Sequence, residues 1–169
     1  TDKLSELTEA YEVRLDELEN KARERSEQIL AAQKQIADAN MVHSLWMRAG
    51  IEKGEQDRLA LYDQILELSP DDVEALTYKA EVLLEMKEEK WALSLCNQAI
   101  EKDPEYALAY WQRACARALL GEKEEAVSDL EIAVDLSESF IDEVDSEPHF
   151  EVLKGSPGFE DLCQRKGGA

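Results

Sequence analysis

A spacing of 34 residues recurs through the middle of the chain, and it limits the possible folds more than any other feature of the sequence. Pro70 and Pro104 lie 34 residues apart, and the residues that precede them, 66–69 and 100–103, are similar in pattern. Three pairs of alanines keep the same spacing: Ala80 and Ala114, Ala92 and Ala126, and Ala99 and Ala133. A fixed period of this length is typical of stacked units, each of which buries its apolar face against its neighbours.

The residue types at the repeated positions predict paired helices. Alanine lets two helices approach closely, and larger side chains would fill the gaps between layers, namely Leu76, Leu83, Tyr110 and Leu130. Pro70 and Pro104 would each end one helix, and the acidic residues that follow them favour the start of the next. Gly121 suits a tight turn between paired helices. The pattern therefore predicts an all-α helical repeat.

This pattern resembles the tetratricopeptide repeat family, whose unit is a helix–turn–helix of about 34 residues. The resemblance covers about residues 39–162, and Leu76, Ala80, Leu83, Ala92, Cys96, Ala99 and Pro104 stand at the signature positions of its best-matched unit. Trp46 and Arg58 depart from the family pattern, where small residues are expected, and Glu138 replaces a proline. The implied fold is a solenoid of three units with a long N-terminal helix and a short C-terminal cap. Its segments are 1–38 for the helix, 39–72, 73–106 and 107–140 for the units, and 141–169 for the cap and tail.

The N-terminal segment is expected to form one long helix, because residues 1–49 contain neither glycine nor proline. Its apolar stripe consists of Leu4, Leu7, Tyr11, Leu15, Leu18 and Ala22, and several members recur after eleven residues. An eleven-residue period disfavours a long left-handed coiled coil, which needs a seven-residue period. Two interpretations stay open. The helix is either solvated beside the domain, or it mediates self-association or docking through Leu7, Tyr11, Leu15 and Leu18.

The C-terminal region has a repeat of its own. Pro148, Phe150 and Leu153 recur nine residues later as Pro157, Phe159 and Leu162. Phenylalanine and leucine three residues apart share one face of a short helix. We expect this region to cover the last face of the repeat stack, as closing segments do in many tetratricopeptide proteins.

The charge of the chain excludes several classes of function. Acidic residues number 39 and basic residues 19, which gives a formal net charge of -20, and most of this charge follows residue 50. A chain this acidic should be repelled by nucleic acids and anionic membranes. No apolar run approaches the roughly 18 residues that a membrane span needs. We therefore expect neither nucleic-acid binding nor direct membrane insertion.

No pattern in the sequence indicates catalysis, a cofactor or a metal site. His43 and His149 each stand alone, and Cys96, Cys115 and Cys163 form no CxxC or CxxH motif. There is no glycine-rich phosphate loop and no nucleophile elbow. We expect a protein that is not an enzyme, with no cofactor and no metal. The scattered cysteines favour a reducing compartment such as the cytoplasm. No signal-peptide pattern stands at Thr1, although a leader removed before Thr1 stays an alternative.

The resemblance implies a concave groove lined by the first helix of each unit. By position, its residues are Asn40, His43, Ser44, Met47, Glu74, Thr77, Tyr78, Glu81, Glu85, Leu108, Trp111, Gln112, Cys115 and Leu119. We expect peptide binding by Tyr78, Glu74, Glu81, Glu85, Leu108, Trp111, Gln112 and Cys115. Trp111 is either the apolar anchor of this groove or is covered by the C-terminal region through Phe150 or Phe159.

Some members of the family hold the acidic tails of chaperones with a clamp of Lys, Asn and Arg. The corresponding positions here are His43, Met47, Tyr78, Leu108 and Gln112, and only His43 could supply a cation. We therefore do not expect a chaperone-tail carboxylate clamp. The expected function is a protein–protein interaction module that binds a basic or amphipathic peptide or helix. The alternative is a structural scaffold or assembly factor that self-associates, as a homodimer for example, through its N-terminal helix.

Overall fold

The structure is a computed structural model that describes residues 2–165, and their regular structure is entirely helical. The α-helices are α1 (Asp2–Ile51), α2 (Glu55–Leu68), α3 (Val73–Glu85), α4 (Glu89–Lys102), α5 (Ala107–Leu120), α6 (Lys123–Leu136) and α7 (Pro157–Arg165). Two 3₁₀ helices, η1 (Glu138–Asp142) and η2 (Pro148–Leu153), precede α7. The described residues contain no strand, so the expected all-α helical repeat fold is confirmed. The predicted segments 1–38 and 141–169 include residues 1 and 166–169, which lie outside the described residues.

The chain divides into two compact units, Thr1–His43 and Ser44–Ala169. The first unit consists of the N-terminal part of α1 and contains no buried side chain among its described residues. This part is helical because strong helix formers fill it without interruption. None of the helices in the described part of the chain is long and apolar enough to cross a membrane.

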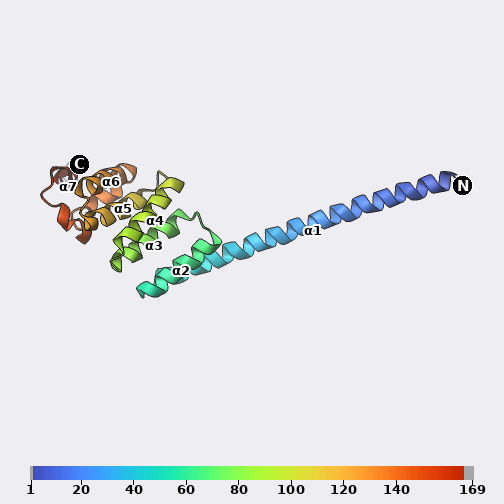
Figure 1. Cartoon of the computed structure of the whole chain (residues 1–169), viewed down its shortest axis with the longest axis horizontal. Helices are drawn as coiled ribbons and strands as arrows, with labels where there is room; N and C mark the ends of the chain where they lie inside the picture. Colours follow the sequence, from blue (N-terminus) through green and yellow to red (C-terminus); the bar gives the residue numbers. More distant parts are fainter. Residues whose placement is uncertain (1, 166–169) are drawn as a thin grey trace. The chain divides into compact units, whose positions relative to one another are not determined.

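The second unit is a stack of helix pairs. Figure 1 shows α2 to α6 following one another in chain order, and α3 packs on α4 as α5 packs on α6. The pairs α3–α4 and α5–α6 occupy the residues expected for the second and third repeats. All six alanines that keep the 34-residue spacing are completely buried, namely Ala80, Ala92, Ala99, Ala114, Ala126 and Ala133. Their small side chains allow the helices to pack closely, as the sequence predicts.

The turns between paired helices differ between the two repeats. Gly121 ends α5 with a φ of 83°, in the left-handed region that glycine adopts readily. Lys87 stands 34 residues earlier and has a φ of 62°. A side chain at this φ is unfavourable, since the left-handed conformation brings Cβ close to the following carbonyl oxygen. The second repeat therefore makes its turn with a positive φ at a lysine, where the third repeat has the glycine that favours this conformation.

The first repeat accommodates its two departures from the family pattern through specific contacts. The ring of Trp46 lies 5.6 Å from that of Tyr62 and 5.9 Å from that of Tyr78, and the two tyrosine rings stack at 6.2 Å. Arg58 on α2 forms an ion pair with Glu85 at the end of α3. Trp46 thus joins the end of α1 to α2 and α3, and Arg58 joins α2 to α3. These contacts replace the close packing of small residues that the family pattern would give.

The C-terminal region closes the stack, which confirms the expected cap. Phe150, Leu153, Phe159 and Leu162 are all buried, and η2 packs on α5 while α7 packs on α6. The rings of Phe150 and Phe159 are 6.4 Å apart. The first of the two repeated motifs forms a 3₁₀ helix and the second forms the α-helix α7. Both motifs use the same spacing to bury a phenylalanine and a leucine.

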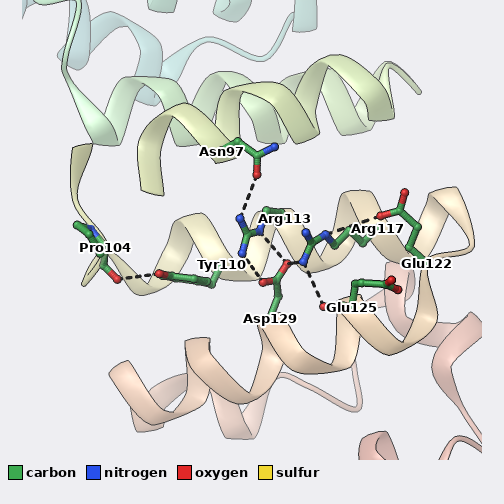
Figure 2. Close-up of polar contacts among 8 residues, drawn as sticks. All are labelled: Asn97, Pro104, Tyr110, Arg113, Arg117, Glu122, Glu125 and Asp129. Atoms are coloured by element: carbon green, nitrogen blue, oxygen red, sulfur yellow. Dashed lines mark hydrogen bonds and ion pairs between the residues drawn. The ribbon is translucent and has the colours of Figure 1, made fainter. Parts of the chain in front are cut away.

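A buried charge cluster joins α5 to α6, as Figure 2 shows. Asp129 is only 1% exposed and accepts hydrogen bonds from Arg113 at 2.9 Å and 2.7 Å and from Arg117 at 2.8 Å. Arg113 also donates to Asn97 on α4 at 3.0 Å. The ion pair with Asp129 raises the pKa of Arg113 against the opposing effect of its burial. Two guanidinium groups thus compensate one buried carboxylate, which is what a buried charge requires.

Candidate binding pocket

The second unit contains a pocket of about 210 Å³ between α3, α5 and the C-terminal cap. We call it the acidic pocket, because four of its eleven lining residues are glutamates. The lining residues are Glu81, Leu84 and Glu85 from α3, Leu108, Trp111, Gln112 and Cys115 from α5, and Phe140, Glu143, Glu147 and His149 from the cap. The repeat helices supply one wall and the cap supplies the other, so neither part alone forms the pocket.

Six of the eight residues expected to bind a peptide line this pocket: Glu81, Glu85, Leu108, Trp111, Gln112 and Cys115. Glu74 is exposed and does not line it, and Tyr78 instead packs in the aromatic cluster with Trp46 and Tyr62. Thr77, expected on the groove surface by position, is completely buried and donates a hydrogen bond to the carbonyl oxygen of Val73 at 2.7 Å. The expectation for Thr77 is therefore wrong, because its side chain satisfies the backbone of its own helix.

Trp111 is not an accessible anchor, which corrects one of the two interpretations of this residue. Its side chain is only 4% exposed, stacked on Phe140 with ring centroids 4.8 Å apart and in edge contact with Phe150 at 5.0 Å. The cap therefore covers the ring, as the alternative interpretation holds. A partner that needed the face of Trp111 would first have to displace η1 and η2.

Glu81 is the least compensated acidic group of the pocket. It is partly buried, and its carboxylate has no ion pair or hydrogen bond among the described residues. Burial raises the pKa of Glu81, and the nearby Glu85 carboxylate raises it further. Glu85 differs because Arg58 already binds it. The pocket thus offers one carboxylate whose negative charge would be stabilised by an added cation.

His149 is the one basic side chain of the lining. Its Nδ1 lies 2.6 Å from a carboxylate oxygen of Glu147, and this hydrogen bond raises the pKa of His149 and lowers that of Glu147. Glu147 also accepts a hydrogen bond from the backbone N–H of His149 at 3.2 Å. The pair holds the start of η2 against the pocket.

Sequence reasoning did not find Glu143, Glu147 and His149 as pocket residues. They follow the last repeat, and the 34-residue pattern assigns them no position. A usable signal was present, since His149 lies between Pro148 and Phe150 of the cap motif. A cap that buries Phe150 against the last repeat necessarily brings its neighbours close to α5.

The residues expected to mediate self-association are all exposed. Leu7, Tyr11, Leu15 and Leu18 each expose about half or more of their side chains, and Leu4, Ile29, Leu30 and Ile36 of the same unit are exposed as well. Large apolar side chains along a helix without packing partners are typical of a surface that contacts another protein. Within the described residues, nothing covers them in the isolated chain.

Comparison with known proteins supports the fold. No protein-family model and no curated protein matches the sequence. Solved structures do match, among them the TPR domain of OM64 from Arabidopsis, with a TM-score of 0.59, 18% identity and coverage of 76% of this chain and 98% of that one.

Two further matches were solved with a ligand. The TPR2B domain of yeast Sti1 in a complex with pHsp70 matches with a TM-score of 0.52, 18% identity and coverage of 79% and 98%. The first TPR of Spaghetti (RPAP3) bound to the HSP90 peptide SRMEEVD matches with a TM-score of 0.51, 19% identity and coverage of 80% and 94%. At these identities the likeness establishes the architecture of the helices and leaves the ligand of this chain open.

Proposed function

We propose that this chain, which has the tetratricopeptide-repeat fold, is a protein-interaction module that binds a positively charged segment of another protein in its acidic pocket. The partner is a protein whose segment carries a lysine or an arginine with apolar residues beside it. The pocket accepts the cationic side chain, and the adjoining exposed surface of α3 and α5, which includes Glu74 and Leu119, contacts the flanking residues.

The observation that carries this proposal is the partly buried carboxylate of Glu81, which has no ion pair among the described residues, in a pocket with three further glutamates. A cation that entered would lie among Glu81, Glu143 and Glu147, and a partly buried charge pair is screened less by salt than one on the surface. A guanidinium or ammonium group carries the positive charge that these carboxylates would attract. A carboxylate would meet like charges, and such contacts cost several kcal/mol in interfaces.

This charge distinguishes the proposal from the ligands of the matched structures. The peptide SRMEEVD of the RPAP3 complex contains three acidic side chains. The positions expected to clamp such a peptide are His43, Met47, Tyr78, Leu108 and Gln112 here, and only His43 could supply a cation. We therefore propose that acidic chaperone tails are not the ligand of this chain.

The test begins with a partner identified by co-purification and mass spectrometry, followed by binding kinetics at low and high salt. The informative variant is Glu81→Gln with Glu143→Gln, because neither residue forms an ion pair with another described residue. Glu85→Lys is avoided since it would also break the contact with Arg58. The matched control is Glu67→Gln with Glu101→Gln, which changes the net charge equally at two exposed sites outside the pocket.

We expect the pocket variant to associate more slowly and with a weaker dependence on salt, because removing charges near an interface weakens electrostatic steering. The control should retain most of the parent's affinity. Equal binding by the parent, the control and the pocket variant would show that the pocket is not the site.

A second candidate function has its own observation, the uncovered apolar stripe of the first unit. Most helical stability in proteins comes from the burial of an apolar face, and the described residues of the first unit bury none of theirs. Two copies of the stripe could cover each other. The chain would then be a scaffold or assembly factor that self-associates through Leu7, Tyr11, Leu15 and Leu18.

Light scattering separates the two candidates. We expect the full chain to be larger than a monomer only if the helix self-associates, and a shortened chain that begins at Gln33 should then be monomeric. Leu15→Glu with Leu18→Glu should abolish the association, whereas Val13→Glu, at an exposed position outside the stripe, should not. A full chain that remains monomeric at high concentration would exclude this candidate.

A further inference from the structure

Three side chains in the acidic pocket carry atoms that commonly bind transition metals. They are Cys115 on α5, Glu147 before η2 and His149 within η2. One ligand atom of each, a sulfur, a carboxylate oxygen and a ring nitrogen, lies within 4.8 Å of both others. The sequence separates Cys115 from the other two by more than thirty residues, so the docking of the cap creates the cluster.

The mixture of donor atoms selects among metals. Thiolate and imidazole are soft or borderline ligands that suit Zn²⁺, whereas Mg²⁺ and Ca²⁺ prefer oxygen ligands alone. In a tetrahedral zinc site the ligand atoms lie about 2.0–2.3 Å from the metal and so about 3.5 Å from one another. The three ligand atoms lie within 4.8 Å of one another, so a small movement would bring them to that geometry, and coordination through His149 Nδ1 would replace its 2.6 Å hydrogen bond to Glu147. Glu147 and His149 have partly exposed side chains on short segments, which leaves room for this movement.

A further polar side chain lies beside the cluster. Gln112 lies one helical turn before Cys115 and lines the pocket, and its side chain is only 7% exposed. The buried side-chain atoms that lack a hydrogen-bond partner among residues 2–165 are Arg58 Nε and Arg117 Nε, so the Gln112 amide is not one of them. A bound ion would give the Glu81 carboxylate of the same pocket a compensating charge.

We propose that Cys115, Glu147 and His149 form a binding site for Zn²⁺, with a fourth coordination position that faces the pocket beside Gln112 and is open to water or to a side chain of the partner. The ion binds the Cys115 sulfur after the thiol loses its proton to solvent, and it binds His149 in the neutral form. Loading therefore joins the cap to α5 through bonds in addition to the contacts of Phe150. This inference is independent of the proposed peptide, since the chain alone supplies all three ligands.

The site would also act on the proposed function. A divalent ion among the glutamates neutralises much of the charge that a basic segment would contact. Zinc should therefore weaken the binding of a cationic segment and favour one that can supply the fourth ligand. Metal binding and segment binding are measured separately, so the failure of one does not decide the other.

Cobalt serves as the test ion, because Co²⁺ occupies zinc sites and its absorption reports both geometry and thiolate coordination. The full chain, kept reduced and free of metal, is titrated with CoCl₂. We expect binding of one ion per chain with a thiolate-to-cobalt charge-transfer band, and displacement of the cobalt by Zn²⁺. Cys115→Ala should abolish the band, and His149→Gln should weaken binding by at least about 100-fold, beyond the 10–100-fold cost of losing an outer-shell partner. Cys163→Ala is the matched control, a cysteine on α7 outside the pocket, and should behave like the parent.

Two results would overturn the proposal. One is cobalt binding without a charge-transfer band, which would place the ion on surface carboxylates. The other is a Cys115→Ala chain that binds cobalt with the parent's affinity. Circular dichroism melts show whether each variant is folded. Glu147→Gln is a third ligand variant, at a position less buried than Cys115. Zn²⁺ should also raise the melting temperature of the parent and of Cys163→Ala, and should leave that of His149→Gln unchanged.

Discussion

At the scale of single residues, the two well-matched repeats solve the same turn in different ways. Gly121 and Lys87 stand at equivalent positions, and both adopt a positive φ. A Cβ added at Gly121 would meet no atom within 4 Å, so a substitution there acts through the backbone alone. Substitutions at these two positions therefore measure the free-energy cost of a side chain in the left-handed conformation.

We expect Lys87→Gly to stabilise the fold by about 0.5–1 kcal/mol, because the left-handed region costs other residues about 1–2 kcal/mol and glycine loses part of that gain in chain entropy. Gly121→Ala should destabilise it by a similar amount. Urea unfolding of the three chains provides the comparison. A stabilised Gly121→Ala would contradict the assignment of strain to this turn.

The buried carboxylate of Asp129 is the second test at this scale. Asp129→Ala leaves Arg113 and Arg117 without their main partner, and breaking a buried ion pair from one side costs about 3–5 kcal/mol. Asp135→Ala removes an ion pair between two exposed side chains, which is worth about 0–1 kcal/mol. Equal unfolding midpoints for the two variants would show that the buried ion pairs of Asp129 stabilise the fold no more than an exposed ion pair does.

At the scale of elements, the repeat depends on alanine where paired helices meet. Ala92 and Ala126 are completely buried and equivalent by the 34-residue spacing. Replacement of either by leucine should cost about 1–3 kcal/mol through overpacking. Ala60→Leu, at an exposed position on α2, should be nearly neutral. Thermal melts of the three variants test the pairing, and a tolerated leucine at position 126 would be inconsistent with it.

The cap is an element whose contribution can be isolated as well. Phe150 packs on Trp111, and Phe150→Ala should cost about 3–5 kcal/mol, the usual range for a buried phenylalanine. Val152→Ala changes an exposed residue of the same η2 and should change the stability little. If Phe150→Ala unfolds at the parent's denaturant concentration, the cap is not part of the cooperative fold.

The sequence was sufficient for the helices of the repeats because their period is local and unusually regular. Pro70, Gly121 and the six alanines specify breaks and close contacts without reference to distant residues. It was also sufficient for the role of the cap, since its two motifs repeat. The side chains that the cap brings to the pocket were not predictable, because their position depends on how η2 docks on α5. Trp111 illustrates this, as the residue suits an anchor and a core position equally well until Phe140 and Phe150 are placed.

At the scale of the whole molecule, the two units offer two kinds of surface. The first presents an uncovered apolar stripe, and the second presents an acidic pocket closed on one side by the cap. The net charge of -20 would extend the proposed preference of the pocket for cations over longer distances, since it attracts basic partners and repels acidic ones before contact. The charge of the ligand is therefore the central claim about function.

Selection of peptides from a random displayed library by the full chain tests that claim most directly. The predicted result is enrichment of sequences with lysine or arginine next to apolar residues, with the enrichment lost in Glu81→Gln with Glu143→Gln and kept in Glu67→Gln with Glu101→Gln. Enrichment of acidic sequences such as SRMEEVD, or of basic sequences that bind the pocket variant as well as the parent, would contradict the account.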